Sequence, residues 1–382
     1  MKIVIAMDSL KGSLSSLQAG TAIREGILRA DPAALVEVRP LADGGEGTVE
    51  ALVSGMGGTL HHVTVTGPMG APADCAYGIL PDGKTAVVEM SGAAGITLVP
   101  AEARNPLRAT TYGVGQVLRD AISHGCRRFI VGIGGSATND GGAGMLQVLG
   151  FGFLDQKGCP IAPGAAGLEE LCTITDEHVL PELAECTFRI ACDVTNPLCG
   201  PRGCSAVYGP QKGATPDMVR QMDDWLARYA ALAAQCRPAS ADPEYPGTGA
   251  AGGMGFAFRT FTNAVLESGI DIVLEETALA VSVRDADLVI TGEGRLDGQT
   301  AMGKAPVGVA RLAKACGKPV IAFAGSVTPD AVACNGAGID AFFPILRSIC
   351  TLEQAMDPET ARRNLADTAE QVFRLWQAAR RE

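Results

Sequence analysis

The chain has 382 residues, long enough for two domains with large buried cores. Hydrophobic residues make up 47% of it and charged residues 19%, a composition typical of folded globular proteins and not of disordered ones. The formal net charge is −11, and no run of Lys or Arg could follow a phosphate backbone, so we expect no nucleic-acid partner.

The N-terminal residues and the cysteines indicate a cytoplasmic protein. Residues 1–8, MKIVIAMD, predict a strand and not a cleavable signal segment, and no apolar stretch approaches the ~20 residues of a membrane span. The closest cysteine pairs, Cys186/Cys192 and Cys199/Cys204, lack the spacing and the histidines of a zinc site. We therefore expect reduced thiols and no membrane partner, with monomer and homodimer both left open.

The first part of the chain repeats a strand, a loop and a helix. An apolar run over residues 2–7 predicts a strand buried on both faces, and a helical pattern over 17–28 follows it. A second strand is expected at 35–40. Three more strands are expected near the C-terminus, at 288–291, 320–324 and 341–345. This alternation predicts a parallel α/β sheet.

The middle of the chain has a different pattern, with short strands joined by Gly/Pro turns. An antiparallel set is expected at 61–66, 74–80 and 85–90, followed by a helix at 114–124 and strands at 128–133 and 188–192. We therefore predict two domains, with a ligand site in the cleft between them. The first is discontinuous and comprises residues 1–65 plus 285–382, and the second is the inserted stretch 66–284.

Two matches to nucleotide-binding motifs lack the context that the chemistry needs. Gly78–Thr85 fits the Walker A pattern, but its Pro-Asp-Gly is a turn sequence and a β-branched run follows it, which predicts a hairpin. Gly247–Gly252 fits the dinucleotide fingerprint, but a proline-rich segment precedes it in place of a buried strand. The second mismatch disfavours one alternative function, an NAD-dependent hydroxy-acid dehydrogenase.

Five loops after predicted strands carry groups that suit phosphoryl transfer. That reaction needs N–H groups and cations around the phosphates, carboxylates for Mg²⁺ and a group that accepts the proton of the substrate hydroxyl. The loops are Asp8–Ser13, Asp43–Thr48, Gly134–Gly142, Cys192–Pro197 and Thr291–Asp297. The four histidines lie outside all five loops, which argues against histidine catalysis.

Each loop also has a plainer interpretation. Asp8 and Lys11 fit a solvated turn, Asp43 and Glu46 fit a helix capping box, and Arg295 fits a structural ion pair. A capping box and a ligand site are compatible in the second loop. The pairing of an acid with a lysine at one strand end, and the gathering of Ser, Thr, Asn and Asp in loop 134–142, favour ligand binding.

Taken in order, these loops resemble the bacterial glycerate kinase family, the two-domain type that acts with ATP. The matching segments are Asp8–Ser13, Ala42–Thr48, Gly134–Gly142, Cys192–Leu198, Gly252–Gly255 and Thr291–Asp297. The resemblance implies transfer of the γ-phosphoryl group of ATP to D-glycerate with Mg²⁺, giving 2-phosphoglycerate in preference to 3-phosphoglycerate. It also implies an α/β fold in two domains, a Rossmann-like parallel α/β domain built from both termini and an inserted mixed α/β domain.

On this basis we assign roles as hypotheses. Asp193 accepts the hydroxyl proton and, with Glu293, is a metal ligand, while Lys11 neutralises phosphate charge and Arg295 holds the substrate carboxylate. The substrate-binding residues are Asp8, Asp43, Glu46 and Asp297. The nucleotide-binding residues are Gly134, Gly135, Ser136, Thr138, Asn139, Asp140 and Gly253. The remaining alternative is a non-catalytic sensor of a small carboxylate or nucleotide.

Overall fold

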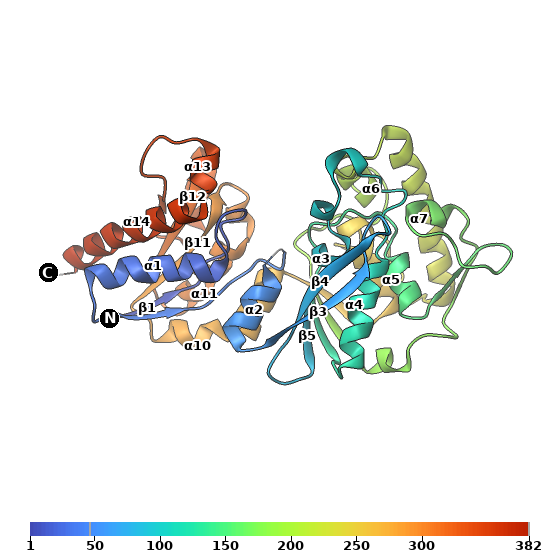
Figure 1. Ribbon diagram of the computed structural model, residues 1–382, viewed down its shortest axis with the longest axis horizontal. Helices are drawn as coiled ribbons and strands as arrows, with labels where there is room; N and C mark the ends of the chain where they lie inside the picture. Colours follow the sequence, from blue (N-terminus) through green and yellow to red (C-terminus); the bar gives the residue numbers. More distant parts are fainter. Residues whose placement is uncertain (46, 381–382) are drawn as a thin grey trace. The chain divides into compact units, whose positions relative to one another are not determined.

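The computed structural model describes residues 1–45 and 47–380, which form two compact units. Unit 1 comprises Met1–Asp43, Glu50–Met56 and the chain from Ile270 onward, and unit 2 comprises Gly44–Val49 and Gly57–Gly269. Figure 1 shows that the blue and red ends of the chain share one unit, while the green and yellow middle forms the other. Each unit has its own sheet and its own buried core.

Unit 1 is built on a five-stranded sheet in which all neighbouring strands are parallel. The order is β13-β12-β11-β1-β2. The strands are β1 (Lys2–Ile5), β2 (Leu35–Val38), β11 (Leu288–Leu296), β12 (Val320–Val327) and β13 (Ala341–Pro344). Ile3, Val4 and Ile5 are fully buried in β1, an interior strand between β11 and β2, as the continuous apolar run predicts. The predicted parallel α/β sheet is confirmed.

The direction of winding reverses between β1 and β11, which pair in the register Ile3↔Leu288. From β1 the chain moves outward to β2, whereas from β11 it moves the other way, to β12 and then β13. Such a point opens a crevice beyond the carboxyl ends of the two strands, where open α/β sheets bind ligands. The residues that follow β1 and the carboxyl end of β11 are therefore the first place to look for a site.

Helices cover this sheet, and two of them, α1 and α14, lie side by side (Figure 1). The helices that lie wholly or largely in unit 1 are α1 (Ser16–Ala30), α2 (Thr48–Met56), α9 (Gly269–Glu276), α10 (Leu279–Arg284), α11 (Ala305–Ala315), α12 (Ala333–Gly336), α13 (Leu352–Met356) and α14 (Pro358–Ala379). A capping box between Ser15 and Gln18 starts α1, and Asp357 caps α14 by accepting a hydrogen bond from the Thr360 N–H at 2.8 Å.

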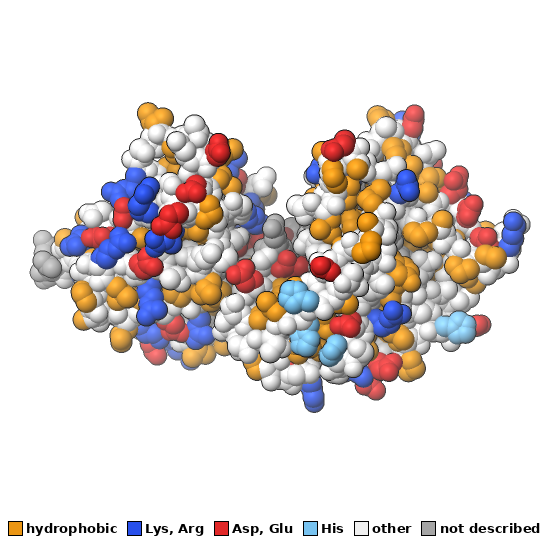
Figure 2. Space-filling model, in the orientation of Figure 1, with side chains coloured by type: hydrophobic (Ala, Val, Ile, Leu, Met, Phe, Trp, Pro, Cys, Tyr) orange, Lys and Arg blue, Asp and Glu red, His pale blue; other side chains and the backbone are white. Residues whose placement is uncertain are grey.

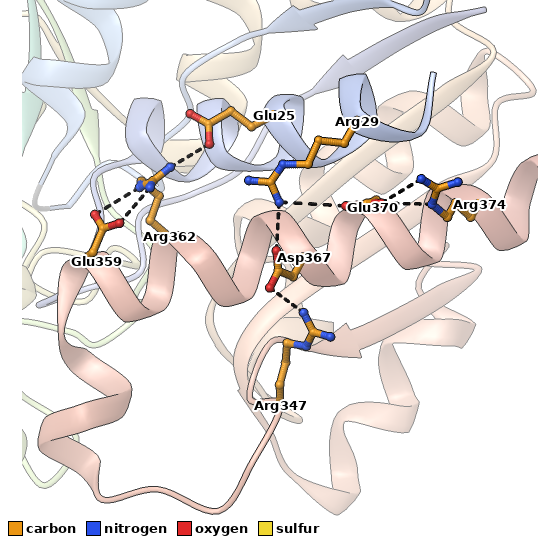
Figure 3. A network of polar contacts seen from close by, with 8 residues as sticks. All are labelled: Glu25, Arg29, Arg347, Glu359, Arg362, Asp367, Glu370 and Arg374. Atoms are coloured by element: carbon orange, nitrogen blue, oxygen red, sulfur yellow. Dashed lines mark hydrogen bonds and ion pairs between the residues drawn. The ribbon is translucent and has the colours of Figure 1, made fainter. Parts of the chain in front are cut away.

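The two long helices approach each other closely at Gly26. A Cβ atom at that position would lie 2.0 Å from the carbonyl oxygen of Ala366, so only glycine fits there. Ion pairs flank the contact on the solvent side, with Arg362 to Glu25 at 2.7 Å and Arg29 to Asp367 at 2.9 Å (Figure 3). Figure 2 shows the resulting surface, with basic and acidic side chains interspersed over α1 and α14.

Unit 2 contains a six-stranded mixed sheet in the order β10-β9-β6-β5-β4-β3. Its strands are β3 (Thr59–Thr66), β4 (Pro72–Ile79), β5 (Thr85–Glu89), β6 (Arg128–Gly132), β9 (Thr187–Ala191) and β10 (Ala264–Glu267). The first three are antiparallel, as predicted, and the others are parallel. A separate antiparallel pair is formed by β7 (Gly152–Leu154) and β8 (Thr173–Thr175).

The helices of unit 2 surround its large core. They are α3 (Ser91–Ala94), α4 (Tyr112–Ser123), α5 (Ala143–Val148), α6 (Cys204–Tyr208), α7 (Pro216–Cys236) and α8 (Met254–Phe261). Stacked rings of Phe129 and Phe188, 4.8 Å apart, join β6 and β9 in this core.

The structure agrees with the rejection of both nucleotide-binding motif matches. β4 and β5 are antiparallel in the register Gly78↔Val87, so the Walker-like segment is the connection of a hairpin. The segment before Gly247 is a run of turns and coil from residue 237 onward, in place of a buried strand. All twelve cysteines are free thiols, and within residues 1–45 and 47–380 no helix has the length and apolar character to cross a membrane.

One predicted boundary is wrong. The strand expected at 288–291 continues to Leu296, because β11 keeps pairing with β12 as far as Leu296↔Val327. Most of the predicted loop Thr291–Asp297 is therefore strand, and its polar side chains are held by the sheet.

Candidate functional site

A pocket of about 380 Å³ lies in unit 1 at the point where the winding reverses. It is lined by the segments after β1, β2 and β13, the carboxyl ends of β11 and β12, the loop into α11, and residues of α13 and α14. Its charged lining residues are Asp8, Lys11, Asp43, Glu293, Arg295, Asp297 and Lys304. Six of these seven were predicted from the sequence, and the structure brings all six to one pocket.

Asp8 and Lys11 are fixed by the turn between β1 and α1. The N–H of Asp8 donates to the carbonyl of Gly292 on β11 at 2.9 Å, which carries the β1 pairing one step beyond the strand. The hydroxyl of Ser16 donates to the carbonyl of Met7 at 2.6 Å and accepts the N–H of Leu41 at 2.7 Å. These bonds tie the ends of β1 and β2 to the first turn of α1.

Asp8 is 2% exposed and faces other carboxylates. Burial, assisted by the negative charge of Asp43, raises the pKa of Asp8 to about 7, although Lys11 acts in the opposite direction. Lys11 lies 3.4 Å from an oxygen of Asp43. Burial alone would lower the pKa of Lys11, but the charges of Asp43 and Asp8 outweigh it and raise that pKa. The charges of Asp8, Lys11 and Asp43 therefore act on one another.

β11 and the loop into α11 supply further charged residues of the pocket. Glu293 accepts a hydrogen bond from the hydroxyl of Thr300, and burial raises the pKa of its carboxyl. Asp297 accepts the N–H of Gln299 at 2.9 Å and that of Thr300 at 3.2 Å, which fixes the turn into α11. The guanidinium of Arg295 is largely exposed and lies 3.8 Å from Asp297, a distance that leaves most of its donors for a ligand.

The sequence interpretation missed Lys304, the third cation of the pocket. It stands at the N-cap of α11, one residue before the helix, and its charge lowers the pKa of Glu293 against the effect of burial. The available signal was the Gly303-Lys304 pair before a helix with Pro306 in its first turn. A lysine there lies beside the positive end of the helix, an arrangement that favours an anionic ligand.

The opposite wall of the pocket is apolar and was not predicted. It is formed after β13 and by α13 and the start of α14, from Ile345, Leu346, Leu352, Ala355, Met356 and Ala361. Gly12, with φ +79°, lies under this wall, since a Cβ there would lie 2.7 Å from the Cε of Met356. The pocket thus has one charged side and one apolar side.

The second predicted site, loop 134–142, belongs to unit 2 and is mostly buried. Gly134 and Gly135 are exposed, whereas Ser136, Thr138, Asn139 and Asp140 are buried; they are 7%, 0%, 0% and 1% exposed, respectively. Asp140 accepts hydrogen bonds from the N–H and hydroxyl of Thr111, from the N–H of Gly142 and from the N–H of Gly144 in the first turn of α5. Its carboxylate therefore organises the loop from inside.

A buried lysine, Lys212, supports this loop and was also missed. It is 2% exposed, and its ammonium donates to the hydroxyl of Ser136 at 2.8 Å and to the carbonyl of Thr138 at 2.6 Å. Burial lowers the pKa of Lys212 to about 8. The hydroxyl oxygen of Thr138 and the amide oxygen of Asn139 are buried without a hydrogen-bond partner. The loop thus retains polar atoms that the protein itself leaves unsatisfied.

Of the other predicted residues, Asp193 is exposed at the carboxyl end of β9, where its Oδ1 accepts the N–H of Gly269 at 3.0 Å. Gly253 precedes α8 and has φ +97°. A Cβ atom at this position would lie 2.7 Å from the Cα of Gly141, so the two backbones are in close contact. Asp193 belongs to unit 2 and Glu293 to unit 1. Glu46 lies outside the described residues.

The carboxylates of unit 1 fit a magnesium ion. Within the described part of the chain, no group of three or more His, Cys, Asp or Glu side chains is arranged to hold a metal by itself. Magnesium needs fewer, because it keeps several waters and binds one or two carboxylates together with the phosphates of a substrate. Asp8 and Glu293, each with a raised pKa, are ionised more readily beside a cation, so this donor set suits Mg²⁺.

Comparison with known proteins decides the family. The model of the "Glycerate kinase family" matches residues 3–377. The chain belongs to the glycerate kinase family. It is 48% identical over 357 residues to a glycerate kinase of Bacillus subtilis, covering 94% of this chain and 93% of that protein. It is 47% identical over 355 residues to the glycerate 2-kinase of Escherichia coli, covering 93% of each.

A solved structure shows the same fold for the whole chain. The crystal structure of a protein from Salmonella typhimurium LT2, described as a candidate glycerate kinase 2, matches with a TM-score of 0.91 at 47% identity and covers 100% of both chains. The resemblance drawn from the loop motifs is therefore confirmed, and membership of the glycerate kinase family makes this chain a phosphotransferase.

Proposed function

We propose that this protein transfers the γ-phosphoryl group of ATP to the 2-hydroxyl of D-glycerate, giving 2-phosphoglycerate and ADP. Family membership and the relatives named glycerate kinase support the reaction, and the relative named glycerate 2-kinase supports the choice of hydroxyl. We place the reaction in the cytoplasm, where ATP is abundant.

The observation that carries the proposal is the pocket of unit 1. It gathers three cations and four carboxylates at the carboxyl edge of a parallel sheet, where the winding reverses. Phosphoryl transfer depends on the positioning of the substrates and on the stabilisation of negative charge. The cations of this pocket can stabilise phosphate charge, and its carboxylates can bind Mg²⁺. A sensor that only binds a small carboxylate would not require a buried carboxyl group with a pKa near neutrality beside a lysine.

Each group has a role in the proposed reaction. Asp8 and Glu293 would hold Mg²⁺, which supplies a positive charge to the phosphates when it is bound. Lys11 and Lys304 offset negative charge on the transferring group, and Asp43 orients Lys11 through their contact at 3.4 Å. Asp193, exposed at the end of β9, accepts the proton of the glycerate hydroxyl.

An assay of ADP release tests the proposal. Purified protein, ATP, Mg²⁺ and D-glycerate should produce ADP, and omission of D-glycerate should abolish most of it. Lys11→Met should lower kcat by about 100-fold or more because it removes a charge that acts on the transferring group. Lys318→Met, which alters a lysine of unit 1 outside the pocket, is the matched control and should retain normal kinetics. ADP release that is independent of D-glycerate would contradict the proposal.

A further inference from the structure

The pocket of unit 1 has more apolar surface than glycerate can use. Every carbon of glycerate carries an oxygen, so the acid has no apolar face to bury. Ligand pockets typically measure ~300–1,000 Å³ and enclose most of their ligand, and this one, at about 380 Å³, lies in the range for a ligand larger than glycerate. The pocket therefore fits a ligand with one anionic part and one apolar part.

Three large side chains of the apolar wall are exposed to solvent. Leu346, Leu352 and Met356 are 40%, 79% and 37% exposed and line the same pocket. Exposed apolar side chains that gather at a concave site are typical of ligand-binding surfaces, because their burial by the ligand stabilises the complex. A planar base, with two apolar faces and a polar edge, suits such a wall.

Two contacts hold the wall in place. Arg347, next to Leu346, forms an ion pair of 2.6 Å with Asp367 on α14 (Figure 3). Met356 packs on Gly12, the neighbour of Lys11 in the turn after β1. The second contact places the apolar wall directly beside the charged side, so one ligand can touch both.

We propose that this pocket binds the nucleotide, with the base of ATP against Leu346, Leu352 and Met356 and the phosphates toward Lys11, Arg295 and Lys304. The proposal rests on the proposed kinase function. It moves the nucleotide from loop 134–142, where the sequence interpretation placed it, to unit 1, and it gives Arg295 to the phosphates and not to the glycerate carboxylate.

Calorimetric titration with Mg²⁺-ADP and with Mg²⁺-tripolyphosphate tests the proposal without relying on turnover. Leu352→Ser should raise the Kd of ADP by about fivefold to tenfold, the loss expected when one apolar group leaves a ligand pocket. The same variant should leave the Kd of tripolyphosphate within twofold, because that ligand has no base. Leu375→Ser is the matched control, since Leu375 is 64% exposed in unit 1 and lies outside the pocket.

Steady-state kinetics provide the second readout. Leu352→Ser should raise the KM of ATP and leave the KM of D-glycerate unchanged, and Leu346→Ser should repeat the effect if the first variant folds poorly. A rise in the KM of D-glycerate alone, equal weakening of ADP and tripolyphosphate, or an ADP Kd matching that of Leu375→Ser would overturn the proposal. Failure of the kinase function is a separate result, because the wild-type protein would then bind ADP and phosphorylate no glycerate.

Discussion

Lys11 and Asp43 meet at 3.4 Å although 32 residues separate them in the sequence. Lys11 follows β1 and Asp43 follows β2, so the contact exists because the two parallel strands end at the same edge of the sheet. Asp8 lies beside this pair, buried, and the charges of Asp43 and Lys11 act on its carboxyl in opposite directions. We therefore expect the pocket of unit 1 to respond to pH and to cations.

Asp8→Asn should stabilise the protein at high pH and have little effect at low pH. The pKa of Asp8 rises from 3.8 to about 7 on folding, so its carboxyl favours the folded state while protonated and loses that benefit as pH rises toward 7. The melting temperatures of wild type and variant should therefore diverge as pH rises from about 4 to about 7 and keep a constant difference above that. Asp285→Asn, at an exposed position of unit 1, is the control. A constant difference in melting temperature across this range would contradict the raised pKa.

The same carboxyl predicts a pH-dependent response to Mg²⁺. The wild-type melting temperature should rise more with Mg²⁺ at pH 8 than at pH 5.5, because the cation binds the ionised form of Asp8. Asp8→Asn should lose most of this difference. An equal response of wild type and variant to Mg²⁺ at both pH values would remove Asp8 from the metal site.

Lys212→Met tests the support of loop 134–142. Burial lowers the pKa of Lys212 from 10.5 to about 8. Between these pH values the unfolded state binds more protons than the folded state. The free energy of unfolding of the wild type should therefore increase from pH 8 to pH 10. Urea unfolding should show this increase in wild type and not in Lys212→Met. Lys157→Met, at an exposed turn of unit 2, should behave as wild type. Identical pH slopes for wild type and Lys212→Met would show that Lys212 titrates normally.

Gly26→Ala should destabilise unit 1 by roughly 2 kcal/mol, because the added Cβ would lie 2.0 Å from the carbonyl oxygen of Ala366 and force α1 and α14 apart. Gly336→Ala is a matched control in the same unit, since a Cβ there meets nothing within 4 Å. Chemical denaturation measures both. Equal stability of the two variants would show that the helices separate without cost.

Asp193→Asn tests the proposed base. If this carboxylate accepts the hydroxyl proton, the variant should lower kcat by about 100-fold or more and leave the KM of ATP nearly unchanged. Asp242→Asn, which changes an exposed carboxylate of the same unit, should retain full activity. A near-normal kcat for Asp193→Asn would assign the proton transfer to another group.

Much of the fold and of the unit 1 pocket could be predicted from the sequence. The buried apolar run at β1 and the strand–loop–helix repeats identify the parallel sheet, and the polar residues after its strands identify six of the seven charged residues of the pocket. These residues could be predicted because the carboxyl ends of parallel strands lie at one edge of the sheet. Polar residues that follow such strands are therefore brought together whatever the rest of the chain does. Glu46 is outside the described residues, and its assigned role stays a prediction.

The burial of Lys212 and of loop 134–142 depends on long-range packing and could not be predicted from the sequence. Lys212 looks like a surface residue in the Gly-Pro-Gln-Lys-Gly turn, and only contacts 74 and 76 residues away bury it. Loop 134–142 has the composition of an open glycine loop, yet its polar side chains point into the core of unit 2. The domain bounds expected at 65 and 285 stay a prediction, while the compact units change near residues 43–57 and 269.

The central claim is that this chain phosphorylates the 2-hydroxyl of D-glycerate with ATP. Phosphorus-31 NMR of a reaction of purified protein with ATP, Mg²⁺ and D-glycerate measures this directly, because the phosphorus of each phosphoglycerate couples to a different number of carbon-bound protons. We predict a doublet from 2-phosphoglycerate that grows as ADP appears. A triplet from 3-phosphoglycerate would contradict the choice of hydroxyl, and the absence of any phosphoglycerate signal would contradict the function itself.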